Sequence, residues 1–531
     1  MCIQYLLFGS IVLPYRLIQF YFEADTQTFH KLLLLPRMKK EKKDLLCGIL
    51  VVVGAFCLHF SCGHFYTVSN MATYIMSYIA ARVDNNISDS SAVWLSALGL
   101  GCQGLAMPIG GFMGSKFGPK STMIATLILG SGSILLTYIV VQKTFIGVVF
   151  TVGIMFGLSM GIGYSVAIAC AVSWFPGRRG LIVGIIVGGF GLGSLIFTPI
   201  QTAYINPSNL KVDSVTRRFT DTELLDRVPN VFLVMGSILA ALQLVACILV
   251  RMKPISKEEH EDGNEEEEEE EGLERARIQT SPSTDSKKKK LVNGDSKLNG
   301  NTVVEVNVKS GKLLRHIDYY LLFFMMLLNC FPISVLTSSL KIFGQTHISD
   351  DRFLSTITAV TSLFNCGGRV VWGAVVDRFS FKIPICIQLC VWSVLLFTFP
   401  VIAYVTGVAL KVLYVIWACA LFFFLSGVFS MMPAATGTIF GPVNLAVNYG
   451  MVYLGFSFGS VLSLVVSLFW KASPEIYFTV SGCVCLVTFA LAIWLDDRNL
   501  PRRLRFMDWF SNQCLSSRVS NQLTVNTSED L

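Results

Sequence analysis

The chain has 531 residues, of which 53% are hydrophobic and only 15% are charged, and its mean hydropathy is +0.60. This balance lies far from that of a soluble domain, so it excludes an ordinary soluble enzyme or binding module and indicates a protein that crosses a lipid bilayer several times. The net charge of +7 sits in loops, and no basic stripe interleaves with aromatic residues, so a nucleic-acid partner is not expected.

The cysteines carry no signature of a disulfide framework or of a metal site. Fifteen are present, and most, such as Cys47, Cys170 and Cys485, lie inside apolar runs, where a thiol packs as a small hydrophobic side chain. We therefore expect neither a metal nor a cofactor.

The first segment, 1–44, is predicted to be cytoplasmic. Its apolar stretch, 2–22, is interrupted by Arg16 and has neither a basic start nor a small-residue cleavage site, so it does not resemble a signal peptide. Met38 then opens the sequence MKKEKKD, which is typical of the basic lead into a first membrane helix. Residues 1–37 are interpreted either as an alternative start or as an interfacial helix.

Apolar runs of about 20 residues, the length that crosses the core of a bilayer, follow in two groups of six. The first group lies at about 45–80, 91–114, 120–141, 145–172, 180–205 and 229–251. The second group lies at about 318–340, 353–376, 382–405, 409–433, 441–470 and 475–495. Between them, residues 252–317 carry an acidic run and the basic run 287–290, a composition that predicts a disordered linker or a segment that docks on anionic lipid.

Lysine and arginine alternate between the loops in a way that predicts the orientation in the membrane. The basic clusters fall at 37–43, 116–120, 178–179, in the linker, at 378–382 and at 498–505. The positive-inside rule places these clusters, both termini and the tail 496–531 in the cytoplasm. The opposite side then receives the glycosylation sequon at Asn86 and the mixed-charge loop 206–227.

Two pairs of similar segments indicate an internal repeat. GFMGSKFGPK at 111–120 matches GAVVDRFSFK at 373–382. GFGLGS at 189–194 matches GFSFGS at 455–460. The offsets within the pairs are 262 and 266 residues, which predicts two related six-helix halves, as in transporters that rock one half against the other. The glycines of 184–193 suit helix faces that approach closely.

Arg369 lies inside one of the apolar runs. An uncharged, largely apolar stretch precedes it at 355–364, and another follows at 370–376. An arginine at mid-membrane costs about 2.5–3.5 kcal/mol, and such residues usually face an aqueous cavity where they meet a partner or a substrate. We therefore expect Arg369 to bind substrate or to act in gating. The alternative is a structural arginine bonded to backbone carbonyls of neighbouring helices.

The duplicated turn at 111–120 and 373–382, of the form G-x-x-x-D-R-x-S-x-K in its second copy, resembles the signature between helices 2 and 3 of the major facilitator superfamily. The segment 174–199 is similar to the fifth-helix region of the oxalate/formate antiporter family. NCGGRVVWG at 365–373 and NYGMVY at 448–453 resemble that family's eighth and eleventh helices. The animal monocarboxylate transporters are its relatives in this interpretation.

The resemblance implies an all-α membrane protein of the major facilitator fold, with twelve transmembrane helices in two pseudo-symmetric six-helix bundles, 45–251 and 318–495. It makes Arg369 the substrate-binding arginine of helix 8, whose guanidinium can hold a carboxylate by two parallel hydrogen bonds. The oxalate transporters add a lysine in helix 11 where this chain has Phe456. One cation favours a substrate with one negative charge, because a second carboxylate would be buried without a partner.

Proton coupling has no standard pair in this sequence. The monocarboxylate transporters carry an aspartate one turn before the arginine, where this chain has Asn365, and their first-helix lysine is missing as well. No Asp or Glu occurs in 45–81, so His59 and His64 are the candidates for carrying a proton. The alternative for each is a hydrogen-bonded structural histidine.

Further polar residues are predicted to line the substrate pocket. Tyr66 and Asn70 lie one turn apart on the first helix, and Tyr164 on the fourth resembles a pocket tyrosine of the family. Asn448 and Tyr453 on helix 11 are additional candidates. Plain helix packing is the alternative for these positions.

The superfamily signature implies a cytoplasmic gate made by Asp377 and Arg378, with Lys116 at the matching turn of the first half. Ser115 replaces the aspartate there, so only one gate latch is expected to be complete. That asymmetry would favour one resting state.

We therefore expect a carrier for small organic anions, foremost monocarboxylates such as lactate, pyruvate or formate, in the plasma membrane, with protons as a candidate co-substrate. An oxalate/formate-type exchanger is one alternative, and a non-transporting membrane sensor or scaffold that acts through the linker is another. An enzyme is not expected, because the apolar part contains no nucleophile, metal cluster or paired carboxylates.

Overall fold

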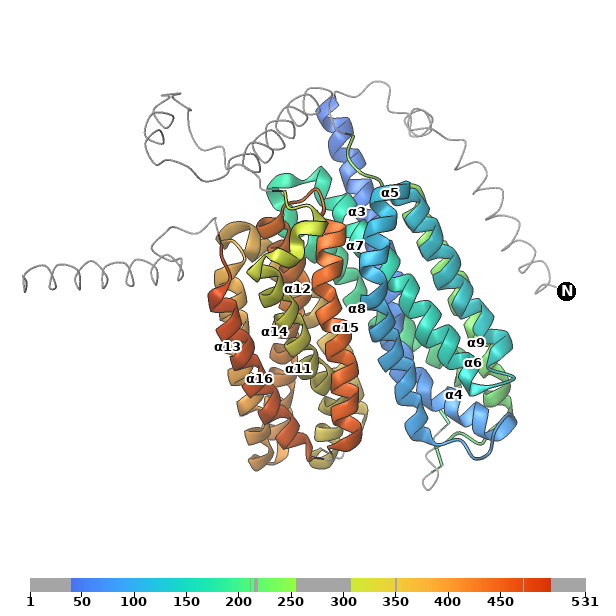
Figure 1. Ribbon diagram of the computed structural model, residues 1–531. Coiled ribbons are helices and arrows are strands. Elements are labelled where there is room, and N and C mark those ends of the chain that lie inside the picture. The colour runs from blue at the N-terminus through green and yellow to red at the C-terminus, as the bar shows by residue number, and fades with distance from the viewer. Residues whose placement is uncertain are drawn as a thin grey trace, which may run out of the picture. The chain divides into compact units, whose positions relative to one another are not determined.

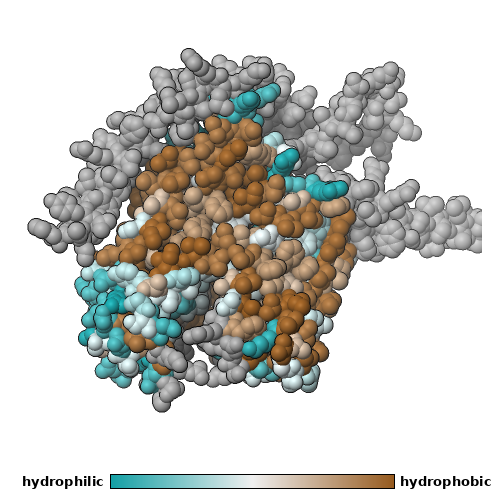
Figure 2. All heavy atoms as spheres, turned by 180° about the vertical axis from the view of Figure 1, so that it is seen from behind, coloured by the Kyte–Doolittle hydropathy of each residue, from teal (hydrophilic) through white to brown (hydrophobic). Residues whose placement is uncertain are grey.

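The computed structural model describes residues 40–210, 212–213, 218–254, 307–348, 351–470 and 472–497. The predictions for residues 1–39, for the linker at 255–306 and for the tail from 498 on fall outside these ranges. Within them every regular element is a helix. Hydrophobic side chains cover the middle of the face in Figure 2, and hydrophilic ones gather toward its ends.

The helices form two groups that follow one another in the chain (Figure 1). The first half contains α3 (Lys40–Cys62), α4 (Val68–Arg82), α5 (Val93–Val140), α6 (Phe145–Val148), α7 (Phe156–Trp174), α8 (Arg179–Ile205) and α9 (Thr222–Leu249). The second half contains α11 (Ile317–His347), α12 (Asp351–Phe379), α13 (Lys382–Thr398), α14 (Gly407–Phe440), α15 (Leu445–Phe469) and α16 (Pro474–Trp494).

Eleven stretches of the described residues are long and apolar enough to cross a bilayer, and one of them, Val93–Val140, is two helices joined at Gly118. Gly118 has a φ of 83°, a left-handed conformation that glycine adopts without a steric penalty. Pro119 then begins the next helix, where its missing N–H costs nothing. The described chain thus contains twelve spans, and the predicted major facilitator fold is confirmed.

The observed elements differ from the predicted runs in several places, of which three have a visible cause or consequence. The first span is broken by a 3-10 segment, Gly63–Thr67, between α3 and α4. The sixth begins at Thr222, ahead of the predicted 229, because the Asp221 side chain accepts a hydrogen bond from the Leu224 N–H at 2.8 Å and caps the helix. The tenth extends to Phe440, where Gly441 turns the chain with a φ of 87°.

The two halves meet along two seams, in which α12 packs on α8 and α15 packs on α5. Glycines allow the helix backbones of the two halves to approach closely in both seams. A Cβ atom added at Gly373 would lie 2.2 Å from the carbonyl oxygen of Gly180, and one at Gly111 would lie 2.7 Å from the backbone nitrogen of Val447. The internal repeat relates α5 to α12 and α8 to α15. Each seam therefore joins one helix from each repeated pair, and the four helices that carry the repeat form the interface between the halves.

The end of the central linker packs on the second half. Val308 donates its N–H to the carbonyl oxygen of Phe440 at 2.8 Å, and the side-chain amides of Asn444 and Asn448 donate to the Val308 carbonyl oxygen at 3.3 and 3.2 Å. The 3-10 helix Ser310–Arg315 follows and buries Leu313 completely. The sequence predicts disorder throughout 252–317, whereas its last residues are held by these bonds and by buried apolar side chains.

Candidate functional site

Arg369 lies within α12 with only 1% of its surface exposed. Its Nε donates to Oδ1 of Asn365 at 3.1 Å, and its Nη1 donates to the carbonyl oxygen of Val187 on α8 at 2.8 Å. The guanidinium carbon stands 4.7 Å from the ring centre of Phe429 and 5.9 Å from that of Phe190, within the range of cation–π attraction. Nη2 is buried and has no hydrogen-bond partner in the described part of the chain.

The contacts of Arg369 include features of both roles that the sequence leaves open, a structural arginine and a substrate-binding one. The bond to Val187 is the backbone contact of a structural arginine. The unused Nη2 is what a binding arginine requires, because a buried charged donor without a partner carries a large desolvation cost. An incoming anion would remove that cost.

The glycines of α8 bring the two halves close enough for the contact with Val187. A Cβ atom added at Gly184 would lie 2.3 Å from the carbonyl oxygen of Arg369, so only glycine permits this approach of α8 to α12. On another face of α8, a Cβ at Gly193 would lie 2.2 Å from the backbone of Gly63. One glycine-rich helix therefore packs closely against both α12 and the broken first span.

A cavity of about 50 Å³ lies beside Arg369. Its walls are formed by residues of both halves: Tyr66, Leu100, Gln103, Tyr164, Phe190, Ile333, Ser334, Thr337, Arg369, Phe429, Tyr453 and Phe456. Among the described residues that form this lining, Arg369 is the only charged one. A small volume, one cation and largely aromatic walls suit a small anion with an apolar body.

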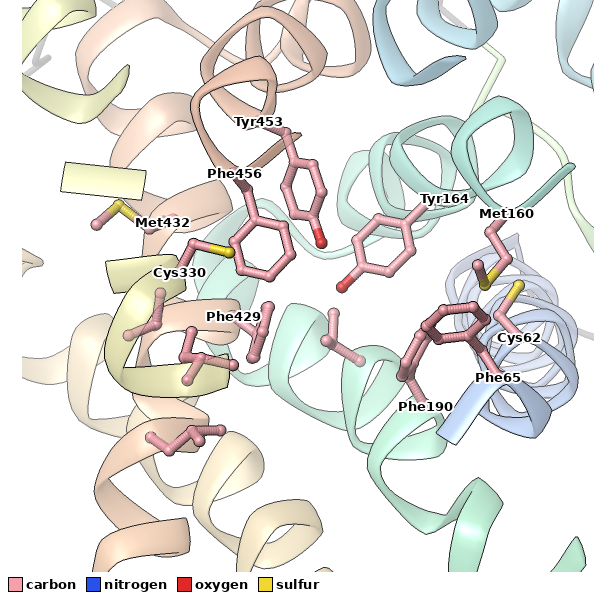
Figure 3. Close-up of a cluster of buried hydrophobic side chains, with 14 of the residues drawn as sticks. Cys62, Phe65, Met160, Tyr164, Phe190, Cys330, Phe429, Met432, Tyr453 and Phe456 are labelled. Carbon is pink, nitrogen blue, oxygen red and sulfur yellow. The ribbon is translucent and has the colours of Figure 1, made fainter. Parts of the chain in front are cut away.

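Two of the predicted tyrosines face each other across this cavity. The ring centres of Tyr164 and Tyr453 are 6.0 Å apart, and Figure 3 shows their hydroxyl oxygens pointing toward one another. Phe456 packs against Tyr453, with 5.1 Å between the ring centres. Tyr66 contributes a third tyrosine to the wall and packs edge-on against Phe190 at 4.9 Å.

Three predicted asparagines do not line the cavity. Asn365 acts through its bond to Arg369. Asn70 donates to the Thr202 hydroxyl at 3.4 Å, which ties α4 to α8. Asn448 bonds Val308 and Ser310 at the end of the linker.

The two histidines are buried among aromatic rings. His59 bonds the Ala55 carbonyl oxygen through Nδ1 at 2.9 Å, and its ring centre is 4.3 Å from that of Tyr164, while Nε2 has no partner among the described residues. His64 contacts Gln201 at 3.1 Å and packs on Phe197. Neither histidine belongs to the cavity lining, but the ring of His59 packs against Tyr164, which does line it.

The carboxylate of Asp377 joins the two halves. One of its oxygens accepts the N–H of Gly180 at 2.6 Å, and the other accepts the N–H of Leu181 at 2.8 Å. These amides belong to the first turn of α8, where the N–H groups have no partner within the helix and the helix dipole attracts an anion. Asp377 of α12 therefore caps a helix of the opposite half.

The other residues of the predicted gate lie apart from this contact. Arg378 stacks beside Phe379, and Lys116 is exposed over the rings of Phe112 and Phe117. In the first half, the hydroxyl of Ser115 donates to its own helix, to the Phe112 carbonyl oxygen at 2.9 Å. The seam between α5 and α15 therefore has no equivalent of the Asp377 cap at that position.

Several lining residues were not predicted. Gln103 is 1% exposed, and its Oε1 lacks a partner among the described residues. The sequence singles out Arg369 because it is a charged residue inside an apolar run. Gln103 is a polar but uncharged residue inside the apolar run 91–114, so the same reasoning applies to it less strongly. Phe190, Phe429, Ser334 and Thr337 carry no such signal, because phenylalanines and hydroxyls are ordinary in membrane helices. Within the described ranges, no group of His, Cys, Asp and Glu could hold a metal ion.

Comparison with known proteins gives a family match across most of the chain. A family model described as the Major Facilitator Superfamily matches residues 54–424 and 322–512. A solved structure of the proton:xylose symporter XylE has a TM-score of 0.55 and 14% sequence identity, and the match covers 85% of this chain and 95% of that one. At that identity the structural similarity is evidence for the fold alone, and it supports the major facilitator fold.

Two curated relatives match over most of their own length and most of this chain. "Apicoplast pyruvate carrier 1" of Toxoplasma gondii is 24% identical over 475 residues, which cover 78% of this chain and 82% of the relative. "Oxalate:formate antiporter" of Oxalobacter formigenes is 24% identical over 439 residues, which cover 80% and 87%. The resemblance drawn from the fifth, eighth and eleventh helices is confirmed. The matches indicate a multi-pass membrane transporter rather than an enzyme.

Proposed function

Because this chain belongs to the Major Facilitator Superfamily, we propose that it carries small monocarboxylates, such as lactate, pyruvate or formate, across a membrane by alternating access. The observation that carries this proposal is the buried Nη2 of Arg369, which has no partner among the described residues and lies beside a cavity of about 50 Å³. The names of the two relatives, a pyruvate carrier and an oxalate:formate antiporter, support the same class of substrate.

Charge and size favour a monoanion. The guanidinium of Arg369 is the only cation among the described lining residues, so a second carboxylate would be buried without a partner. The hydroxyls of Tyr164 and Tyr453 can donate to the carboxylate oxygens that Nη2 does not reach. The rings of Phe190, Phe429 and Phe456 then enclose the short carbon chain.

The arrangement of the halves supports alternating access. Asp377 closes the end at which α12 meets the start of α8. A larger cavity of about 280 Å³ lies between α5, α11 and α15 toward the opposite end and shares three lining residues with the smaller one. We assign the Asp377 end to the cytoplasm and the host to the plasma membrane, on the basis of the basic clusters at 116–120 and 378–382.

The test is uptake of labelled lactate, pyruvate and formate by proteoliposomes that contain the purified chain. Arg369→Ala should abolish uptake, and Arg369→Lys should retain a small part, because an ammonium keeps the charge but loses the planar fork. Arg227→Ala is the matched control, since Arg227 pairs with Glu223 outside the cavity. Unchanged uptake in Arg369→Ala would overturn the role of that residue.

The same vesicles distinguish the modes of coupling. Uptake that requires an anion inside the vesicle identifies an oxalate/formate-type exchanger. Stimulation by external acid that disappears in His59→Gln assigns a proton to His59, which contacts the cavity through Tyr164. Absence of flux for every anion, together with loss of cellular function when 255–306 is deleted, would instead favour a sensor or scaffold.

A further inference from the structure

The small cavity beside Arg369 and the larger cavity share Leu100 of α5 and Ser334 and Thr337 of α11. The shared residues mark the passage, by which we mean the place where the larger cavity, of about 280 Å³, adjoins the smaller one, of about 50 Å³. Leu100 comes from the first half and the two hydroxyl residues come from the second. The two cavities therefore adjoin at one large apolar side chain from the first half and two short polar ones from the second.

Leu100 lies where α5 separates from α15. Below it, toward Gly118, a Cβ atom at Gly104 would lie 2.5 Å from the Ser457 hydroxyl, and Ser457 also donates to the Gly101 carbonyl oxygen. Above it, α5 and α15 contribute opposite walls of the larger cavity, and their ribbons diverge toward the end where α4 lies (Figure 1). Leu100 is thus the first side chain of α5 on the open side of the seam.

The row of α5 that faces the larger cavity consists of Val93, Ser96, Ala97 and Leu100, the spacing of one helix face. Leu100 is the largest of them and the one closest to the small cavity. It is half-buried against the apolar core, which fixes the position of its side chain. Opposite it, Thr337 donates its hydroxyl hydrogen to its own helix, to the Ile333 carbonyl oxygen at 2.9 Å.

We infer that Leu100 sets the longest carbon chain that the transporter accepts, with Ser334 and Thr337 as the facing wall. This inference rests on the proposed function, because it takes the carboxylate of the substrate to be held at Arg369. A carbon chain that begins there and outgrows about 50 Å³ finds further space in the larger cavity, beyond the shared residues. A short acid ends before Leu100, whereas a longer or branched acid meets its methyl groups.

The experiment compares the uptake of pyruvate, with three carbons, and 4-methyl-2-oxopentanoate, with six, in proteoliposomes. Leu100→Ala should raise the ratio of long-acid to short-acid uptake by about tenfold, the discrimination that one or two methylene groups give in an apolar pocket. Leu100→Phe should lower that ratio and serves as a second variant, because it leaves no void in the core.

Leu98→Ala is the matched control, because Leu98 lies on the same helix but points toward Gly153. The Cβ of Leu98 is 3.5 Å from the position that a Cβ added at Gly153 would take. This variant should leave the ratio unchanged. If Leu100→Ala and Leu100→Phe transport pyruvate with an unchanged ratio while Arg369→Ala is inactive, the proposed function stands and the role of Leu100 falls. A wild-type chain that carries neither acid would overturn both.

Discussion

Asn365 holds the side chain of Arg369 in place without neutralising its positive charge. Its Oδ1 accepts one N–H of the guanidinium without carrying charge, so the arginine is oriented but not neutralised. An aspartate in the same place would form an ion pair and compete with an anionic substrate. The amide therefore keeps the cavity electropositive.

Asn365→Asp should raise the KM for pyruvate by about tenfold or more at neutral pH, because the new carboxylate occupies the arginine and repels the substrate. Acidification should lower the KM again, since protonation of the aspartic acid releases the guanidinium. Uptake at two external pH values measures both effects. Asn365→Ala is the control, because it removes the same bond without adding a charge and should show no such recovery.

Helical geometry explains which of the predicted residues meet at the cavity. Asn448 and Tyr453 share a motif, yet they are five residues apart and point about 140° away from each other around the helix. Tyr453 and Phe456, three residues apart, both line the cavity. The spacing in the sequence is therefore enough to predict that Asn448 lies on a different face of the helix from Tyr453 and Phe456. The contact of Arg369 with Val187 could not be predicted, because it depends on how α8 is placed against α12.

At the scale of elements, glycine decides which helix faces form the seams between the halves. On α12, a Cβ atom at Gly373 would lie 2.2 Å from the backbone oxygen of Gly180, whereas one at Gly367 would meet nothing within 4 Å. The two glycines are in the same helix and differ only in what they face. Backbone atoms cannot move aside as a flexible side chain can.

Gly373→Ala should therefore weaken the closed arrangement at the Asp377 end, whereas Gly367→Ala should be tolerated and stabilise α12 slightly through helix propensity, by up to about 1 kcal/mol. Hydrogen exchange of the Gly180 and Leu181 amides reports the difference, because Asp377 protects both. We expect faster exchange in Gly373→Ala alone. Equal exchange in the two variants would contradict this role for the seam.

The positions of the helices follow from hydropathy, but their irregularities do not. All twelve predicted runs correspond to observed spans, because a length of about 20 apolar residues is a local property. The break at Gly63–Thr67 is not local: a Cβ atom at Gly63 would lie 2.5 Å from the Phe190 carbonyl oxygen of α8. Such a break depends on a partner far along the chain.

At the scale of the whole molecule, the two seams are built alike but are fastened differently. Asp377 caps α8 from the opposite half, four residues after the glycine that packs on α8. In the other seam, Ser115 stands four residues after Gly111, which packs on the backbone at Ala446 and Val447 of α15. The sequence repeat predicted this correspondence. That the Ser115 hydroxyl would bond its own helix could be seen only in the structure.

Ser115→Asp should supply the missing latch, because a carboxylate one turn beyond Gly111 reaches the first-turn amides of α15, Ala446 and Val447. A carboxylate at a helix N-terminus contributes about 0.5–2 kcal/mol, so the closed arrangement should gain up to about thirtyfold in population and the rate of pyruvate uptake should fall. Exchange of the Ala446 and Val447 amides should slow in parallel. Ser115→Asn is the isosteric control, and its smaller effect would isolate the contribution of the charge. If Ser115→Asp leaves both the exchange and the uptake rate unchanged, the seam between α5 and α15 does not limit opening, and the Asp377 cap alone sets the resting state.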